Sequence, residues 1–282
     1  MINANGATGG FLTRELASRG APVRALVRDR AKALDTLPAG TDVVAGDVTD
    51  IGSVRAALRG VEAVYLATPA HPELDAIEHA IAHACVDAGV ARIVKLGGIR
   101  VVDDSAPPLM MKLHGRGQRA IRESGVPWVH LRASFFMQNF FMSAPEIAAG
   151  LVHAPTGNAR ASFVDARDIA RCAAVVLTEP GHEGREYDIT GPEALSFGDA
   201  ARVLGRELGR DVAHVDVPTA GWVQAAVGAG APAWVVARLG ELYDHLRATE
   251  FAAAPTDAVR TITGRAPIDF ATFVRDHRAA FG

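Results

Sequence analysis

The sequence predicts an α/β protein built on a doubly wound parallel sheet, with a smaller and less regular C-terminal lobe. Two observations predict this class. Short β-branched runs alternate with longer amphipathic segments through the first half of the chain, and a glycine-rich turn precedes the first amphipathic segment. Alternation at this spacing is typical of a parallel sheet with helices on both faces. The alternation loosens after about residue 131, where we expect the second lobe to begin.

The elements of the first half have well-marked ends. Gly20, Gly60, Gly89 and Gly125 each follow a helical segment, where a left-handed cap favours glycine. Asp50 stands at the N-cap position of one helix. The expected strands are Val23–Val27, Asp42–Ala45, Ala63–Leu66, Arg92–Leu96 and Trp128–Leu131, and the expected helices are Gly10–Arg19, Ala31–Leu37, Ile51–Leu58, Pro72–Ala88 and Leu109–Ser124.

The second half mixes shorter elements. We expect residues 1–150 to form a dinucleotide-binding domain that reclaims a strand and a helix from about 161–177, and residues 151–282 to form mainly a substrate lobe. Ligands of such folds bind beyond the carboxyl ends of the strands, here between sheet and lobe. The expected elements are an aromatic run Phe135–Met142, strands Ala161–Val164, Glu186–Thr190 and Val212–Val217, and helices Ala166–Leu177, Ser196–Leu208, Ala220–Ala229, Ala233–Arg247 and Asp269–Phe281.

Composition excludes several classes. With 29 basic and 32 acidic residues, the net charge of −3 lacks the basic footprint of a nucleic-acid-binding protein. Two cysteines, Cys85 and Cys172, cannot form a disulfide scaffold. We expect no membrane span, because glycines and prolines interrupt the most apolar window, and a cytoplasmic location, because no signal segment is evident. His79 and His83 lie one helical turn apart, but zinc needs more ligands, so no metal site is expected.

The glycine-rich turn is the first candidate site. Its Gly6 and Gly9 have the spacing of the last two glycines of a dinucleotide-binding turn, which lets the pyrophosphate approach backbone N–H groups at a helix start. Asn3 takes the place of the first glycine; asparagine tolerates left-handed backbone, but its side chain crowds the approach. The turn residues expected to contact the cofactor are Asn3, Asn5, Gly6, Ala7, Thr8 and Gly9.

The strand before this turn is short. Only Met1 and Ile2 precede Asn3, whereas a buried strand usually has about five residues. Either the natural start lies upstream, or the strand is cut short and the cofactor site is altered. We therefore expect the ancestral fold to be that of a dinucleotide-binding protein, and leave cofactor binding itself open.

The residues after the expected strand Val23–Val27 favour NADP(H). An NAD-preferring site carries an acidic residue there, whereas this chain carries Arg28, followed by Asp29, Arg30 and Lys32. A guanidinium suits a 2′-phosphate through bidentate, charge-assisted hydrogen bonds. The alternative is a solvated basic loop, and the acidic residue Asp29 in the same segment is an argument for that alternative.

Eight motifs in order resemble the NmrA-like family of atypical short-chain dehydrogenase/reductase proteins, and its NAD(P)H:quinone reductase-like branch. They are NGATGG at 5–10, VRALVRD at 23–29, GDVTD at 46–50, SGVPW at 124–128, FMQNF at 136–140, FVDARDIA at 163–170, YDITGPEA at 187–194 and ITGRAP at 262–267. The resemblance covers essentially the whole chain. It implies a Rossmann-type fold with a C-terminal substrate lobe, pyrophosphate contacts at Gly6–Gly9, a 2′-phosphate contact at Arg28, adenine contacts at Asp47 and Val48, and Ala67, Thr68 and Pro69 beside the cofactor. The family holds reductases and also proteins that bind the cofactor without turnover.

Catalytic residues are less evident. No tyrosine is followed four residues later by lysine, so the usual Tyr-x-x-x-Lys machinery for carbonyl reduction is absent. The candidates are His114, which could relay a proton near neutral pH, and Lys112, which could orient a ribose or a substrate oxygen. The alternative is that both are partly exposed helix residues. Hydride transfer to a quinone needs less acid catalysis than reduction of a ketone.

An apolar pocket is predicted where the aromatic run meets the end of a strand. Aromatic and thioether side chains make adaptable walls for a flat ligand. Core packing between lobes is the alternative for at least half of them, and Gln138 serves either as a polar handle or as a partner of nearby backbone. The expected pocket residues are Met110, Phe135, Phe136, Gln138, Phe140 and Trp222.

Three functions stay open. The first is an NADP(H)-dependent oxidoreductase that transfers hydride to a flat conjugated carbonyl or quinone-like small molecule. The second is a redox-inactive NADP-binding regulator or sensor, and the third is a cofactor-independent cyclase or isomerase on the same fold. A homodimer is compatible with each.

Overall fold

A computed structural model describes residues 1–100 and 108–282. Its centre is a parallel sheet formed by β1 (Arg24–Val27), β2 (Asp42–Ala45), β3 (Ala63–Leu66), β4 (Arg92–Gly98), β5 (Trp128–Ala133) and β8 (Arg185–Ile189). β1 pairs with β2, and β3, β4, β5 and β8 pair in that order, all in parallel. The five strands expected in the first half therefore form where the sequence predicts them, which confirms the α/β class.

The residues before the glycine turn join the two groups of strands. The Leu26 N–H donates to the Met1 carbonyl at 2.9 Å, and the Ile2 N–H donates to the Tyr65 carbonyl at 3.0 Å. Ile2 forms a parallel bridge with Leu26 and is buried. Met1 and Ile2 thus occupy the central strand position between β1 and β3, which is the doubly wound order with a first strand of two residues.

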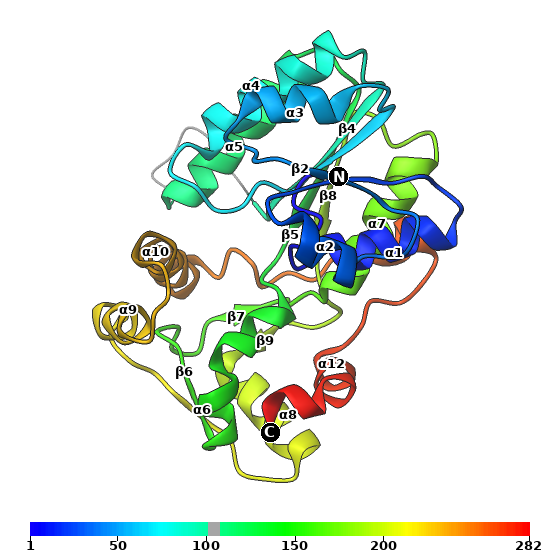
Figure 1. Cartoon of the computed structure of the whole chain (residues 1–282). Helices are drawn as coiled ribbons and strands as arrows, with labels where there is room; N and C mark the ends of the chain where they lie inside the picture. The colour runs from blue at the N-terminus through cyan, green and yellow to red at the C-terminus, as the bar shows by residue number, and fades with distance from the viewer. Residues whose placement is uncertain (101–107) are drawn as a thin grey trace.

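Helices cover both faces of the sheet (Figure 1). α3 (Ile51–Leu58), α4 (Leu74–Asp87) and α5 (Leu109–Glu123) lie on one face, and α1 (Gly9–Ser18) and α7 (Ala166–Thr178) lie on the other. Because side chains alternate along a strand, Ile93 packs with the first group and Val94 with the second. α2 (Arg30–Thr36) flanks the β1–β2 edge, and α11 (Ala258–Thr263) packs on α7.

The C-terminal lobe has its own aromatic core, in which Phe140, Phe163, Phe197 and Phe270 meet with ring centroids 4.8–6.2 Å apart. β6 pairs in parallel with β10, and β7 pairs antiparallel with β9. The elements are η1 (Met137–Ser143), α6 (Ala144–Ala148), β6 (Leu151–His153), β7 (Arg160–Ala161), β9 (Leu195–Ser196), α8 (Phe197–Leu208), β10 (Ala213–Val215), α9 (Thr219–Gly228), α10 (Ala233–Thr249), α12 (Phe270–Asp276) and η2 (Arg278–Phe281).

Three expected elements differ in the structure. The strand expected at Ala161–Val164 is reduced to β7, and Val164 instead forms an isolated bridge with Phe136. The helix expected at Asp269–Phe281 divides into α12 and the 3-10 helix η2. The aromatic run, for which no helix was expected, forms most of the 3-10 helix η1, and its first two residues, Phe135 and Phe136, precede that helix. No helix in the described part of the chain is both long and apolar enough to cross a bilayer.

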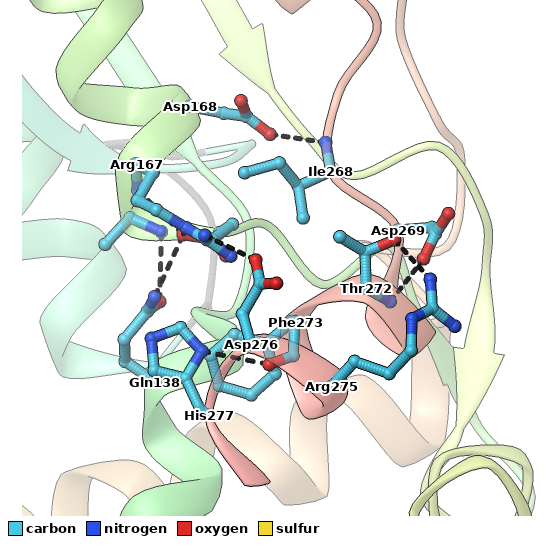
Figure 2. A network of polar contacts seen from close by, with 12 residues as sticks. Gln138, Arg167, Asp168, Ile268, Asp269, Thr272, Phe273, Arg275, Asp276 and His277 are labelled. Atoms are coloured by element: carbon cyan, nitrogen blue, oxygen red, sulfur yellow. Dashed lines mark hydrogen bonds and ion pairs between the residues drawn. The ribbon is translucent and has the colours of Figure 1, made fainter. Parts of the chain in front are cut away.

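A polar network of Gln138, Asp165, Arg167 and Asp276, which we call the clasp, connects the lobe to the start of α7 (Figure 2). The Arg167 guanidinium binds the buried Asp165 at 2.7 Å and Asp276 of α12 at 2.6 Å. The Gln138 side chain donates to Asp165 at 3.0 Å and accepts from the Ala166 N–H at 3.0 Å. One turn further, buried Asp168 accepts from the Ile268 N–H at 2.6 Å, and burial raises the pKa of this carboxyl.

Candidate cofactor and substrate site

The glycine turn folds back on itself at the carboxyl end of the Met1–Ile2 segment. Asn3 adopts φ 60°, the left-handed region that the sequence suggested it could tolerate. The Gly6 N–H donates to the Asn3 carbonyl at 2.9 Å, and the Gly9 N–H donates to the Gly6 carbonyl at 3.1 Å. A Cβ on Gly9 would lie 2.4 Å from the Ala4 carbonyl oxygen, so only glycine fits there.

The turn leaves the start of α1 open on one side. Asn5 and Ala7 are exposed, whereas Thr8 is buried and its hydroxyl lies 2.9 Å from that of Tyr65. Thr8 therefore supports the sheet instead of facing outward. The first N–H groups of α1 have no side-chain cap, and such groups bind phosphate oxygens readily.

Polar and charged residues follow the ends of three strands of the sheet. Exposed Arg28 follows β1, Asp47 follows β2, and His71 follows β3. Two hydrogen bonds from Thr49 lower the pKa of Asp47 most, and the charges of Arg28 and His71 lower it further. The other residues expected to contact the cofactor after β2 and β3 are half-buried Val48, buried Ala67, half-buried Thr68 and exposed Pro69.

Asp29, whose negative charge was an argument against an NADP site, has a structural role. Its carboxylate caps α2 by accepting from the Lys32 N–H at 3.0 Å. Arg30 is likewise engaged, since its Nε donates to the Val43 carbonyl at 3.2 Å. Arg28 forms no hydrogen bond to any other residue that the structure describes, so its guanidinium is available to an anion.

A buried polar cluster lies below the carboxyl ends of β3 and β4. Lys95 Nζ contacts Glu78 Oε1 of α4 at 2.6 Å, and both side chains are fully buried. His114 Nδ1 of α5 lies 3.4 Å from Lys95 Nζ. Three polar atoms here are buried without a hydrogen-bond partner in the described chain: Thr68 Oγ1, Glu78 Oε2 and Gln118 Nε2. We call Thr68, Glu78, Lys95, His114 and Gln118 the β4 cluster.

The β4 cluster changes the chemistry available to His114. Burial first, and the Lys95 charge second, lower the pKa of His114 to about 3. The ring is therefore neutral at pH 7, and this environment does not favour the imidazolium relay considered from the sequence. Burial raises the pKa of Glu78, opposed by Lys95 and Thr68. Lys112 is half-buried, and its side chain forms no hydrogen bond with another described residue.

The aromatic run packs into the cores of the two lobes. Phe135 stacks on Tyr243 at 5.9 Å, and Tyr243 meets Trp222 edge-on at 5.3 Å. Phe135, Tyr243 and Phe140 are all buried in the core of the C-terminal lobe, and half-buried Trp222 packs against that core. Phe136 packs against the core of the sheet domain. Half-buried Met110 begins α5, and the amide of Gln138 is engaged in the clasp.

Sequence reasoning did not assign Lys95, Glu78, Gln118 or Tyr243 to the site. A signal was present for two of them. Lys95 is a charged residue within the apolar run at residues 93–96 of β4. Glu78 lies on the apolar face of α4 among Leu74, Ile81 and Cys85. A lysine and a glutamate at such positions are almost never buried unless they are paired.

Two other features lie apart from this site. His79 and His83 have ring nitrogens 3.2 Å apart, and no group of three or more metal-binding side chains occurs among residues 1–100 and 108–282. A polar cavity of about 630 Å³ in the lobe is lined by the 156–159 loop, His214, Asp216, Arg247 and Glu250, and contains none of the residues expected from the sequence.

Comparison with known proteins places the chain in context. Residues 1–245 match the family described as the NmrA-like family. The chain is 37% identical over 283 residues to an NAD(P)H azoreductase of Xenophilus azovorans, which covers 100% of this chain and 98% of that protein. Residues along the whole length therefore contribute to the likeness.

Solved structures show the same fold. A triphenylmethane reductase of a Citrobacter species, complexed with NADP(H), superposes with a TM-score of 0.86 at 24% identity and 98% coverage of both chains. An NADPH-dependent quinone oxidoreductase of Escherichia coli, complexed with NADPH, gives a TM-score of 0.86 at 23% identity, again with 98% coverage of both. These likenesses confirm the Rossmann-type architecture.

Proposed function

The chain belongs to the NmrA-like family, and from this premise we propose that it is an NADP(H)-dependent oxidoreductase that transfers hydride to a flat conjugated acceptor, such as a quinone. Three similar proteins support the proposal: their names describe reduction of an azo compound, a triphenylmethane and a quinone. All three acceptor types are planar or extended conjugated systems. Half-buried Trp222, which packs edge-on against buried Tyr243, offers an aromatic surface of matching chemistry.

The residues present fit the cofactor. The turn from Asn5 to Gly9 and the start of α1 would hold the pyrophosphate, and Arg28 would hold the 2′-phosphate. Asp47 and Val48 would border the adenine, and the segment Ala67–Pro69 would border the nicotinamide half. When bound, NADP(H) supplies the hydride, which is two electrons and one hydrogen nucleus; water supplies the second proton of the reduced acceptor.

The observation that carries the cofactor choice is the contrast between Arg28 and its neighbours. Asp29 is committed to the cap of α2 and Arg30 to the Val43 carbonyl, whereas Arg28 stands exposed at the carboxyl end of β1. Charge-assisted hydrogen bonds contribute about 1.5–3 kcal/mol each. A 2′-phosphate at Arg28 would therefore separate NADPH from NADH by roughly ten- to a hundredfold in affinity.

Calorimetric titration tests this choice. We expect Arg28→Ala to weaken NADPH binding by roughly ten- to a hundredfold and to change NADH binding little. Lys32→Ala is the matched control, because it removes a positive charge from the first turn of the adjacent helix α2 while the backbone N–H that Asp29 binds remains. Equal weakening of both dinucleotides by Arg28→Ala would refute the 2′-phosphate assignment.

A panel of quinones and azo dyes then tests catalysis with the unaltered protein. Oxidation of NADPH, followed by its absorbance, with at least one flat acceptor supports the proposal. Tight NADPH binding without turnover across the panel would instead indicate a redox-inactive NADP-binding protein. Absence of binding at millimolar dinucleotide would favour a cofactor-independent enzyme.

A further inference from the structure

The surroundings of Lys95 Nζ fix the direction of its hydrogen bonds. Three acceptors surround it: Glu78 Oε1 at 2.6 Å, His114 Nδ1 at 3.4 Å and the Leu96 carbonyl at 3.4 Å. An ammonium has three donors and no acceptor. The three donors therefore match the three acceptors, and His114 Nδ1 must accept.

An accepting Nδ1 determines the tautomer of His114. In the neutral imidazole, the proton then resides on Nε2. The nearby charged groups agree with a neutral ring. Lys95 faces it from β4, and Glu78 of α4 lies behind Lys95; His130 of β5 is Lys95's cross-strand neighbour and is itself neutral, with a pKa lowered to about 2. α10 also packs on α5, and it contributes no described charge that shifts the pKa of His114.

We propose that Lys95, held by Glu78, is a positioning residue that fixes His114 as a neutral Nε2–H hydrogen-bond donor for the acceptor atom of the substrate. This inference rests on the proposed function. In this proposal His114 acts through the fixed dipole of its Nε2–H group and does not relay a proton. Negative charge grows on the oxygen or nitrogen of the acceptor as hydride arrives, and a preorganised donor stabilises that charge without having to ionise.

The packing around the pair shows that the fold is shaped for it. A Cβ on Gly117 would lie 1.7 Å from Glu78 Oε2, and one on Gly97 would lie 2.9 Å from Gln118 Nε2. A glycine inside a helix costs roughly 1 kcal/mol relative to alanine. α5 carries that cost at Gly117, where it admits the Glu78 carboxylate.

Nitrogen NMR of the imidazole tests the tautomer directly, without turnover. We expect His114 of the unaltered protein to be neutral, with its proton on Nε2, from pH 5 to 8. The double variant Lys95→Met/Glu78→Leu removes both charges together, so that neither is left buried alone. We expect its His114 pKa to rise, but to stay below 6.5, because the ring remains buried after the Lys95 charge is removed. A proton on Nδ1 in the unaltered protein, or a His114 pKa unmoved in the double variant, would overturn the inference.

Kinetics tests the donor role. His114→Phe should lower kcat about tenfold or more while NADPH affinity stays within twofold, since one hydrogen bond to the developing charge is lost. His114→Gln keeps an N–H donor near the position of Nε2 and should lose several-fold less. Equal losses in the two variants would refute the donor role. A pH profile of kcat with an ionisation near 6.5 that His114→Gln abolishes would refute it too. If the unaltered protein oxidises no NADPH, the proposed function fails and the donor role fails with it, whereas the NMR result still decides the tautomer.

Discussion

Two buried polar networks of this molecule differ in how completely their atoms are satisfied. In the clasp, both carboxylate oxygens of Asp165 accept hydrogen bonds, and both ends of the Gln138 amide are used. In the β4 cluster, Gln118 Nε2 lacks a partner in the described chain, and Thr68 Oγ1 and Glu78 Oε2 make no hydrogen bond of good geometry, although the Thr68 hydroxyl lies close enough to lower the pKa of Glu78. Buried polar groups in native proteins are normally paired, and an exception requires an explanation.

The difference indicates two kinds of role. A satisfied network such as the clasp fixes one arrangement of the backbone, here the start of α7 against α12. The β4 cluster, at the strand ends where ligands of this fold bind, retains hydrogen-bonding capacity that its own residues do not use. Water, a cofactor or a substrate can use that capacity, which is why we assign chemistry to the β4 cluster and architecture to the clasp.

The largest expected effect comes from breaking the Lys95–Glu78 pair on one side only. Lys95→Met leaves a carboxylate buried without its counter-ion, and such changes cost about 3–5 kcal/mol. The double variant Lys95→Met/Glu78→Leu should recover most of that loss, because an apolar pair of similar volume often matches a buried ion pair in stability. Urea unfolding of both variants measures this. A double variant as unstable as the single one would mean that the pair itself supports the fold.

The sheet and the glycine turn could be predicted from the sequence. Strand–helix alternation predicts the sheet, and the Gly6–Gly9 spacing predicts the turn, because both follow from local patterns. The N-cap role of Asp29 was not predicted, because the helix was expected to begin at Ala31, whereas α2 begins at Arg30. The structure then separates Arg28 from the other charges of its loop.

The β4 cluster was not accessible, for a physical reason. Lys95 and Glu78 are 17 residues apart and meet only because β4 and α4 pack in one particular register. No periodicity encodes that register. The aromatic run was ambiguous for a related reason: Phe136, just before the 3-10 helix η1, packs on the core of the sheet domain, whereas Phe140 within η1 packs into the core of the lobe.

A smaller effect is expected where α5 meets Glu78. Gly117→Ala places a Cβ 1.7 Å from Glu78 Oε2, so the carboxylate or the helix must move, at a cost of roughly 1–3 kcal/mol. Gly221→Ala in α9 is the matched control, because a Cβ there meets nothing within 4 Å. It should stabilise the protein by about 0.5–1 kcal/mol through helix propensity. Thermal unfolding compares the two, and a stabilising Gly117→Ala would contradict the tight packing of the β4 cluster.

The smallest effect is expected in the clasp, at its exposed end. Asp276→Asn removes one charge partner of Arg167 and leaves the buried contact of Arg167 with Asp165 in place. Because Asp276 is 44% exposed, the loss should stay within about 1 kcal/mol, as for other solvent-screened pairs. Urea unfolding and steady-state kinetics measure both aspects, with exposed Asp211→Asn as the charge-matched control. Unchanged kcat and KM would support a purely structural role for the clasp. A fall in kcat at unchanged stability would mean that the clasp transmits lobe position to the substrate site, and the contrast with the β4 cluster would then be one of degree.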